Sequence, residues 1–121
     1  MISNAESLVM EALWQKEPLT SEEILAQVGP ARGWSSTTVK TLLARLVAKG
    51  AVKASRDGKR NLYRPALQRA DYVAHESESL IERLFDGRVA PFVSHFSERH
   101  KLTREDIDDL KRLIEEFDDG E

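Results

Sequence analysis

The sequence predicts a mainly α-helical chain with one small β-hairpin, because helical periodicity fills most of the 121 residues and one short stretch alternates instead. Three short helical segments precede the alternating stretch, which is the order of a winged helix-turn-helix domain. Three further segments, rich in acidic residues, follow it. We therefore predict a winged helix-turn-helix domain over residues 1–66 and a C-terminal helical dimerisation region over residues 67–121.

The first two predicted helices share one start signal, the S/T-x-x-E capping box, in which a hydroxyl and a carboxylate accept each other's backbone N–H. The boxes are Ser3 with Glu6 for a helix over residues 1–17, and Thr20 with Glu23 for a helix over residues 20–28. A proline follows each helix and stops it, because the residue before proline avoids the helical conformation. The second helix is expected to turn Ile24, Leu25 and Val28 inward.

The third predicted helix runs between Ser35, whose hydroxyl caps its start, and Gly50, which is free to take the left-handed conformation that closes a helix. Its apolar face is expected to hold Val39, Leu42, Leu43, Leu46 and Val47. Its opposite face is hydroxyl-rich and cationic, with Ser36, Thr37, Lys40, Thr41, Ala44, Arg45 and Ala48. Such a face fits a DNA major groove, where hydroxyls and cations meet phosphates and base edges. Trp34 is either a core anchor or a DNA contact, and we favour the core.

A basic hairpin is predicted directly after the third helix. Strands over residues 51–55 and 60–64 flank a turn that contains Asp57-Gly58, a strong signal for a tight connection. The cationic rim of this hairpin consists of Lys53, Arg56, Lys59, Arg60 and Arg64. Leu62 is expected to face inward and Tyr63 outward.

Charge is distributed unevenly along the chain. Residues 1–66 hold ten Lys/Arg and six Asp/Glu, a net charge of +4, whereas residues 67–121 hold eight and fifteen, a net charge of −7. Within residues 32–64 there are nine Lys/Arg and one acid, Asp57. A solvated surface is the simpler explanation of such a cluster, but its place on one helix face and a hairpin favours nucleic-acid binding.

Composition excludes several classes of function. The absence of cysteine excludes disulfides, thiolate metal sites and cysteine nucleophiles. His75, His95 and His100 lack the i, i+4 helical pair of a zinc-protease site, so surface or interface positions explain them better than a weak metal or pH effect. There is no glycine-rich phosphate loop. We therefore expect no enzyme activity, no metal and no cofactor.

Neither a targeting segment nor a membrane segment is evident. No apolar run approaches the ~20 residues that span a bilayer. The N-terminus has no basic start followed by an apolar core, so we expect no signal peptide. A cytoplasmic protein without membrane insertion is expected.

The second half is predicted to contain three amphipathic helices, over residues 69–85, over residues 89–99 and from Thr103 onward, with a frayed tail at residues 118–121. Their apolar stripes are too large for so few residues to bury, and an exposed apolar seam marks an association surface. The predicted dimer interface consists of Leu80, Ile81, Leu84, Phe85, Phe92, Phe96, Ile107, Leu110, Ile114 and Phe117. Packing of this half onto the winged domain of the same chain is the alternative.

Several short motifs together resemble one family of bacterial proteins. The motifs are Ile2-Ser3-Asn4-Ala5-Glu6, Trp14, Trp34-Ser35, Thr38-Val39-Lys40-Thr41-Leu42, Arg45-Leu46 and Lys49-Gly50. An L-T-x-x-D-I-x-x-L pattern from Leu102 to Leu110 adds a weaker match. Over nearly its whole length the chain resembles the penicillinase-repressor family of transcription factors, the BlaI/MecI/CopY type.

The resemblance implies a dimeric repressor of transcription. Each protomer of such a protein places a winged helix on half of a palindromic DNA operator, and the C-terminal helices hold the dimer together. The DNA-contacting positions that carry over are Ser36, Thr37, Lys40, Thr41 and Arg45 on the recognition helix, Arg56, Lys59 and Arg60 on the wing, and Asn4, where family members approach a phosphate.

Two departures from the family pattern bear on how such a repressor is released from DNA. Copper-responsive members end in Cys-x-Cys pairs, and a chain without cysteine does not match a copper-thiolate sensor. Members that respond to β-lactams are cleaved at an Asn-Phe bond in the second C-terminal helix. The matching bond here is His95-Phe96, which keeps the Phe but not the Asn. The resemblance therefore leaves cleavage, with a membrane-bound sensor protease as partner, as one candidate mechanism.

A protein-interaction adaptor is the alternative function. Winged helices also bind proteins, and the acidic helical half offers a surface for a partner. Charge reversal at Lys40 and Arg45 discriminates between the two functions. This charge reversal should abolish DNA binding. Partner binding by an adaptor whose contacts lie in the C-terminal half should be unaffected.

Overall fold

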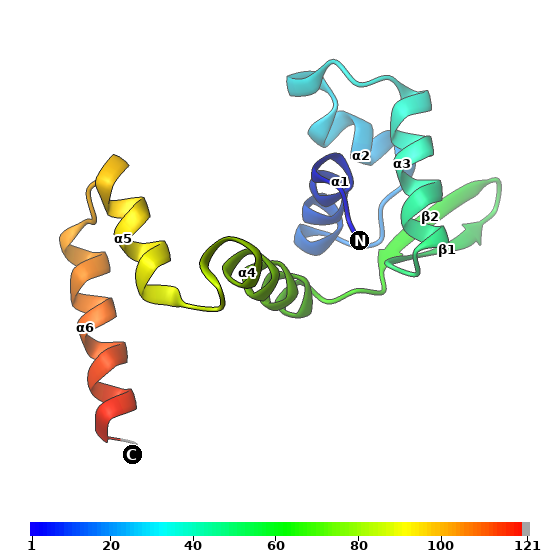
Figure 1. Ribbon diagram of the computed structural model, residues 1–121. Helices are drawn as coiled ribbons and strands as arrows, with labels where there is room; N and C mark the ends of the chain where they lie inside the picture. Colours follow the sequence, from blue (N-terminus) through cyan, green and yellow to red (C-terminus); the bar gives the residue numbers. More distant parts are fainter. Residues whose placement is uncertain (120–121) are drawn as a thin grey trace. The chain divides into compact units, whose positions relative to one another are not determined.

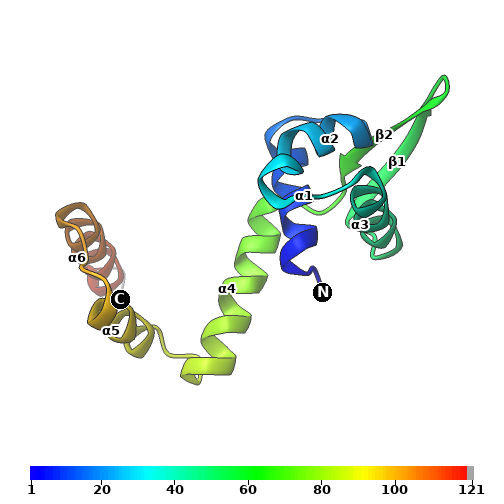
Figure 2. The same cartoon turned by 90° about the horizontal axis from the view of Figure 1, so that it is seen from above.

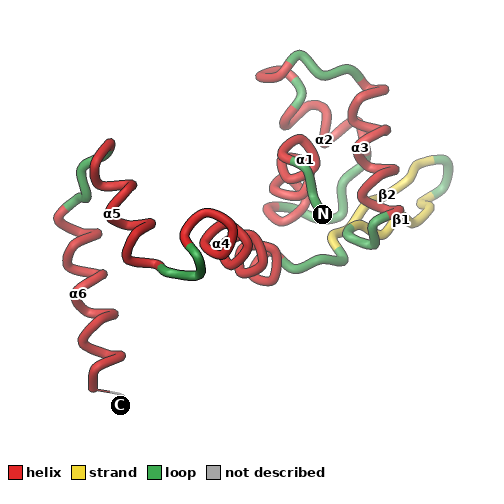
Figure 3. The backbone as a smooth tube through the Cα atoms, viewed as in Figure 1, coloured by secondary structure: helices red, strands yellow, loops and turns green. Residues whose placement is uncertain are grey.

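The computed structural model describes residues 1–119 and contains the helices and the hairpin that the sequence predicts (Figures 1 and 3). The elements in chain order are α1 (Asn4–Gln15), α2 (Ser21–Val28), the 3-10 helix η1 (Pro30–Arg32), α3 (Ser36–Ala48), β1 (Val52–Asp57), β2 (Arg60–Pro65), α4 (Arg69–Phe85), α5 (Val89–Arg99) and α6 (Arg104–Asp119). The chain divides into two compact units, Met1–Ala74 and the residues from His75 onward. The first unit thus extends past the boundary expected after residue 66, into the first turns of α4.

Both predicted capping boxes are present in the first unit. The Ser3 hydroxyl accepts the Glu6 N–H at 3.1 Å, and the Glu6 carboxylate accepts the Ser3 N–H at 2.7 Å. Thr20 and Glu23 repeat the arrangement at 3.2 Å and 2.9 Å. Because a capping residue precedes its helix, the helices begin one residue after Ser3 and Thr20.

The core of the first unit lies between its three α-helices and the start of β1. It consists of Val9, Met10, Ala12, Leu13, Leu19, Ile24, Val39, Leu42, Leu43, Leu46, Ala51 and Val52. Trp34 is half-buried and packs against this core, as expected. Val47, the fifth residue expected on the apolar face of α3, is 40% exposed. It lies at the edge of the apolar face in the last turn of α3, where no facing element covers it.

The hairpin is closed by a two-residue connection, Gly58-Lys59, between the paired residues Asp57 and Arg60. Gly58 has a φ of +64°, the left-handed conformation that such a turn requires. The strands therefore end later than predicted. Figure 2 shows the two strands side by side next to α3.

Tyr63 faces the core, which corrects the prediction that it lies outward. It packs against the buried cluster, and its backbone forms two hydrogen bonds with Leu19, Leu19 N–H to Tyr63 O at 3.1 Å and Tyr63 N–H to Leu19 O at 2.9 Å. Leu62 is half-buried on the opposite face, because successive strand residues point to opposite sides. The bridge to Leu19 decides which face turns inward, and the strand pattern alone did not reveal it.

A partly buried ion pair joins the start of α1 to the end of α3. The Lys49 Nζ donates to Glu6 Oε1 and to the Met1 carbonyl, both at 2.6 Å. The Glu6 side chain is 1% exposed and that of Lys49 is 36% exposed. Burial raises the pKa of Glu6, but the hydrogen bonds from Lys49 and Ser3 outweigh it, so the pKa lies below its ordinary value of 4.5.

We expect Glu6→Gln to lower the free energy of unfolding at pH 7 by about 1–2 kcal/mol, because charged hydrogen bonds are lost while Lys49 regains water. The unfolded chain binds more protons than the folded chain between the folded pKa of Glu6 and 4.5. The stabilisation is therefore complete above pH 4.5 and is lost as pH falls through the folded pKa. Urea unfolding at pH 7 and at pH 4 measures this. Equal losses for Glu6→Gln and for the exposed control Glu17→Gln would contradict it.

The second unit contains the rest of α4 with α5 and α6, and none of its described residues is buried. The cap of α6 is as predicted, with the Thr103 hydroxyl accepting the Asp106 N–H at 3.0 Å. The helix continues to Asp119, into the tail that is expected to fray. Residues 120 and 121 lie outside the described part of the chain.

Candidate nucleic-acid interface

One face of α3 is exposed along its whole length and carries the predicted DNA-contacting residues. Ser36, Thr37, Lys40, Thr41 and Arg45 are all exposed, as are Ala44 and Ala48 beside them. The other face is fixed to the core by Val39, Leu42, Leu43 and Leu46. Because the same helix is buried on one side and cationic on the other, it presents its polar side chains to solvent in a defined orientation.

The start of α3 is set by a cap and by the turn before it. The Ser35 hydroxyl accepts the Thr38 N–H at 3.2 Å. Gly33 has a φ of +67°, and the Trp34 N–H donates to the Gly29 carbonyl at 3.2 Å. These contacts fix where the first exposed hydroxyls of α3 lie.

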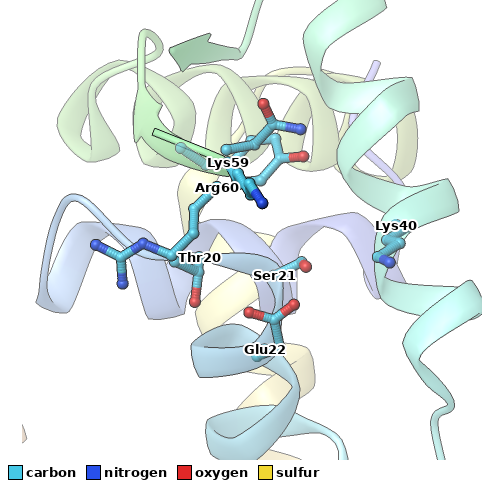
Figure 4. Close-up of a pocket in the computed structure, with 8 residues that line it drawn as sticks. Thr20, Ser21, Glu22, Lys40, Lys59 and Arg60 are labelled. Carbon is cyan, nitrogen blue, oxygen red and sulfur yellow. The ribbon is translucent and has the colours of Figure 1, made fainter. Parts of the chain in front are cut away.

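A depression of about 360 Å³ brings α3, the hairpin and the start of α2 together (Figure 4). The residues that line it are Thr20, Ser21, Glu22, Lys40, Lys59, Arg60, Asn61 and Tyr63. Three of them are cationic and one is acidic, so the depression is positively charged. A helix N-terminus adds partial positive charge and free backbone N–H groups. The arrangement suits a phosphate group of a polyanion.

The hairpin presents its cations on both of its faces. By strand register, Arg56 shares a face with Val52 and Tyr63, whereas Arg60 lies on the opposite face. Arg60 Nη2 and Asp57 Oδ2 form an exposed ion pair at 3.0 Å. Such a pair is worth about 0–1 kcal/mol, so Arg60 exchanges it for another anion at little cost.

The structure gathers some of the predicted contact residues and leaves others apart. Lys40, Lys59 and Arg60 line the same depression. Arg45 and Arg56 are exposed outside its lining, and Asn4 is exposed at the first position of α1. No observation tests their individual contacts, which stay predictions.

The contribution of α2 to this interface was not predicted from the sequence. Thr20 was expected only as a helix cap, whereas Ser21 and Glu22 line the depression together with Lys40 and the hairpin. The order of the elements is a signal for this placement. In a helix-turn-helix, the helix that precedes the recognition helix crosses the DNA backbone, so its N-terminus can lie near the DNA. Lys49 was also counted in the basic cluster, whereas it pairs with buried Glu6.

The second unit exposes a large apolar surface. Among its described residues, Leu84, Val89, Phe92, Phe96, Leu113, Ile114 and Phe117 are between 38% and 73% exposed. A hollow of about 360 Å³ between α5 and α6 is lined by Phe92, Val93, Phe96, Leu102, Asp106, Asp109, Leu110 and Leu113. Leu113 lines this hollow and is not among the interface residues predicted from the sequence, although it lies three residues from Leu110 on the same helix.

Two of the histidines of the second unit, His95 and His100, lie beside aromatic rings. The ring of His100 stacks on Phe96 with centroids 5.0 Å apart, and His95 lies 6.2 Å from Phe85. Within residues 1–119, no three His, Asp or Glu side chains are grouped to hold a metal ion. In the same range, none of the helices combines the length and the apolar character that crossing a bilayer requires.

A three-helix core, a hairpin joined to it through Leu19 and an exposed cationic helix define a winged-helix DNA-binding protein. Residues 2–116 match the penicillinase repressor family. The chain therefore belongs to the penicillinase repressor family, whose members are DNA-binding transcriptional repressors and not enzymes.

Individual relatives agree with this assignment. The chain is 31% identical over 115 residues to the penicillinase repressor of Bacillus licheniformis, covering 95% of this chain and 90% of that one. It is 28% identical over 113 residues to the methicillin resistance regulatory protein MecI of Mammaliicoccus sciuri, covering 93% and 92%. The solution structure of monomeric Bacillus licheniformis BlaI with the blaP half-operator has a TM-score of 0.53 and 32% identity, covering 60% of this chain and 88% of that one.

Proposed function

We propose that the chain is a dimeric repressor that occupies a palindromic operator in the cytoplasm, each protomer reading one half-site with α3 and the basic hairpin. The main support for this proposal is the positively charged depression that Lys40, Lys59 and Arg60 line together with the start of α2. The likeness to BlaI bound to a half-operator supports it.

The two kinds of side chain on α3 have different tasks in this proposal. Lys40 and Arg45 enter the major groove, where an arginine can form a bidentate pair with guanine. Ser36, Thr37 and Thr41 contact phosphates or thymine methyl groups. The hairpin cations and Asn4 contact the DNA backbone and fix the register. Bound over a promoter, the protein excludes RNA polymerase.

A second copy of the chain is the proposed cover for the apolar surface of α4, α5 and α6. The ten interface residues predicted from the sequence are all exposed or half-buried in the single chain. An apolar surface of this extent, on a unit whose described residues are all exposed or half-buried, favours association with another chain. Two copies also match the twofold symmetry of a palindromic operator.

Release by proteolysis stays a prediction. His95 and Phe96 are exposed, but their peptide bond lies inside α5, so a protease must first unwind that helix. A membrane-bound sensor protease is the proposed partner. Mass spectrometry of the protein from its own cells under derepressing conditions tests this. An intact chain at full derepression would contradict it.

Selection from a pool of random-sequence duplexes tests the proposed function. The purified chain should enrich one sequence that repeats with twofold symmetry, and DNA protection should show two equivalent half-sites. An unenriched pool would contradict sequence-specific binding. The alternative, an adaptor that acts through the acidic helices, would then direct the search toward a protein partner.

A further inference from the structure

The first turns of α4 are fixed to the winged domain by a set of contacts around Trp14. The Trp14 Nε1–H donates to the Leu67 carbonyl at 2.9 Å, and the Trp14 ring lies against Tyr72 with centroids 5.5 Å apart. Arg69 Nε lies 3.2 Å and 3.3 Å from the two carboxylate oxygens of Glu11. We call these contacts the Trp14 clamp. Figure 2 shows the start of α4 beside α1.

The connection from β2 to α4 is short and is itself held. The N–H groups of Ala66 and Leu67 both donate to the Ala51 carbonyl, at 2.8 Å and 3.1 Å. Leu67 packs against the core. Two of the three residues between β2 and α4 are therefore held by Ala51, and one of these two also packs on the core. The clamp and this connection all lie within the first unit, which includes residues up to Ala74.

A change in direction at the start of α4 moves the far end of this long helix. It runs without interruption for 17 residues, from the first unit into the second. At 1.5 Å per residue it is roughly 25 Å long, so a tilt of ~10° at its start displaces its end by about 4 Å. The rise of DNA is about 3.4 Å per base pair, so such a tilt is comparable to a change of one base pair in half-site separation.

We propose that Trp14 is a positioning residue that sets the half-site spacing which the dimer accepts. This inference rests on the proposed dimeric operator binding. Trp14 is half-buried between α1 and the start of α4, away from the depression that suits a phosphate, and acts through the direction of α4. Rigid attachment gives the dimer a narrow spacing preference, because effective concentration falls when the geometry does not match.

The test compares wild type with Trp14→Phe, which removes the indole N–H and retains an aromatic ring. The probes are duplexes with one half-site, or with two half-sites at separations that change in single base-pair steps, taken from the sequence selected by the wild-type chain. One added base pair also rotates the second half-site by roughly 34°. We expect this insertion to weaken binding of the wild-type chain about tenfold or more. It should weaken binding of Trp14→Phe less than about threefold. The affinity for a single half-site should agree between the two proteins within about twofold.

Two further variants make the result decisive. Tyr72→Ala removes the aromatic ring on α4 that contacts Trp14 and leaves the three-helix core intact. If Trp14→Phe destabilises the fold, the spacing preference of Tyr72→Ala still tests the inference. Gln15→Ala is the matched control, because Gln15 neighbours Trp14 on α1 but bonds Gln27 of α2, and it should keep the wild-type profile. If both clamp variants keep the wild-type spacing profile, the role of Trp14 is overturned, while the proposed dimeric function still stands. A wild-type chain that gains nothing from a second half-site would overturn the dimeric function, and the inference with it.

Discussion

The double substitution Lys40→Glu with Arg45→Glu is expected to abolish operator binding, with a loss of about a thousandfold or more near 0.1 M salt. Each protomer loses two cations on the exposed face of α3 and gains two anions that face DNA phosphates. An arginine paired with guanine contributes a further ~1–3 kcal/mol of discrimination at its base. Fluorescence anisotropy with the selected duplex measures the loss.

The control for this double substitution changes the net charge equally but elsewhere. Lys101→Glu with Arg112→Glu alters two exposed cations outside α3, the hairpin and the lining of the depression. This variant should bind within a few-fold of wild type, because neither residue belongs to the proposed DNA-contacting surface and salt screens exposed charges away from the DNA. Similar losses in both variants would mean that overall charge, and not α3, determines binding. Retained binding in Lys40→Glu with Arg45→Glu would favour the adaptor function.

The second large effect is expected from Ile114→Lys with Phe117→Lys on α6. These side chains are 60% and 73% exposed in the single chain, so their replacement disturbs no existing core. In a dimer they would bury charges in an apolar interface, which is strongly unfavourable. The variant should be monomeric by sedimentation. It should bind two-half-site DNA about 10²–10⁴-fold more weakly, because the second half-site is no longer bound intramolecularly.

A charge-matched control separates the apolar seam from the charge of α6. Glu105→Gln with Glu115→Gln also raises the net charge by two, and both residues lie on the face of α6 opposite Leu110. It should remain dimeric. A dimeric Ile114→Lys, Phe117→Lys variant would place the association surface elsewhere on the chain. The affinity of that variant for a single half-site should equal that of wild type, since α3 is untouched.

Local signals predicted most of the elements correctly. The capping boxes at Ser3 and Thr20 and the cap at Thr103 depend on residues three positions apart, so the sequence contains the whole interaction. The two faces of α3 followed from helical periodicity for the same reason. Val47 is 40% exposed at the edge of this face. Periodicity gives the direction of a side chain but not the extent of the element that covers it.

The remaining features depend on contacts between distant parts of the chain. Tyr63 faces inward because of its bridge to Leu19, and Lys49 is held by Glu6 across 43 residues of sequence. The meeting of Ser21 with Lys40 and the hairpin is of the same kind. The Trp14 clamp joins residues more than 50 positions apart, and nothing local to either one predicts it.

Specific binding of an operator by a dimer can be tested by footprinting on the DNA upstream of the protein's own gene across a salt series. We expect one protected, twofold-symmetric site. With about six phosphate contacts per dimer, the logarithm of the binding constant should fall with the logarithm of salt concentration at a slope near −5. No protection at low salt, or uniform coating of the DNA, would contradict specific operator binding by a dimer.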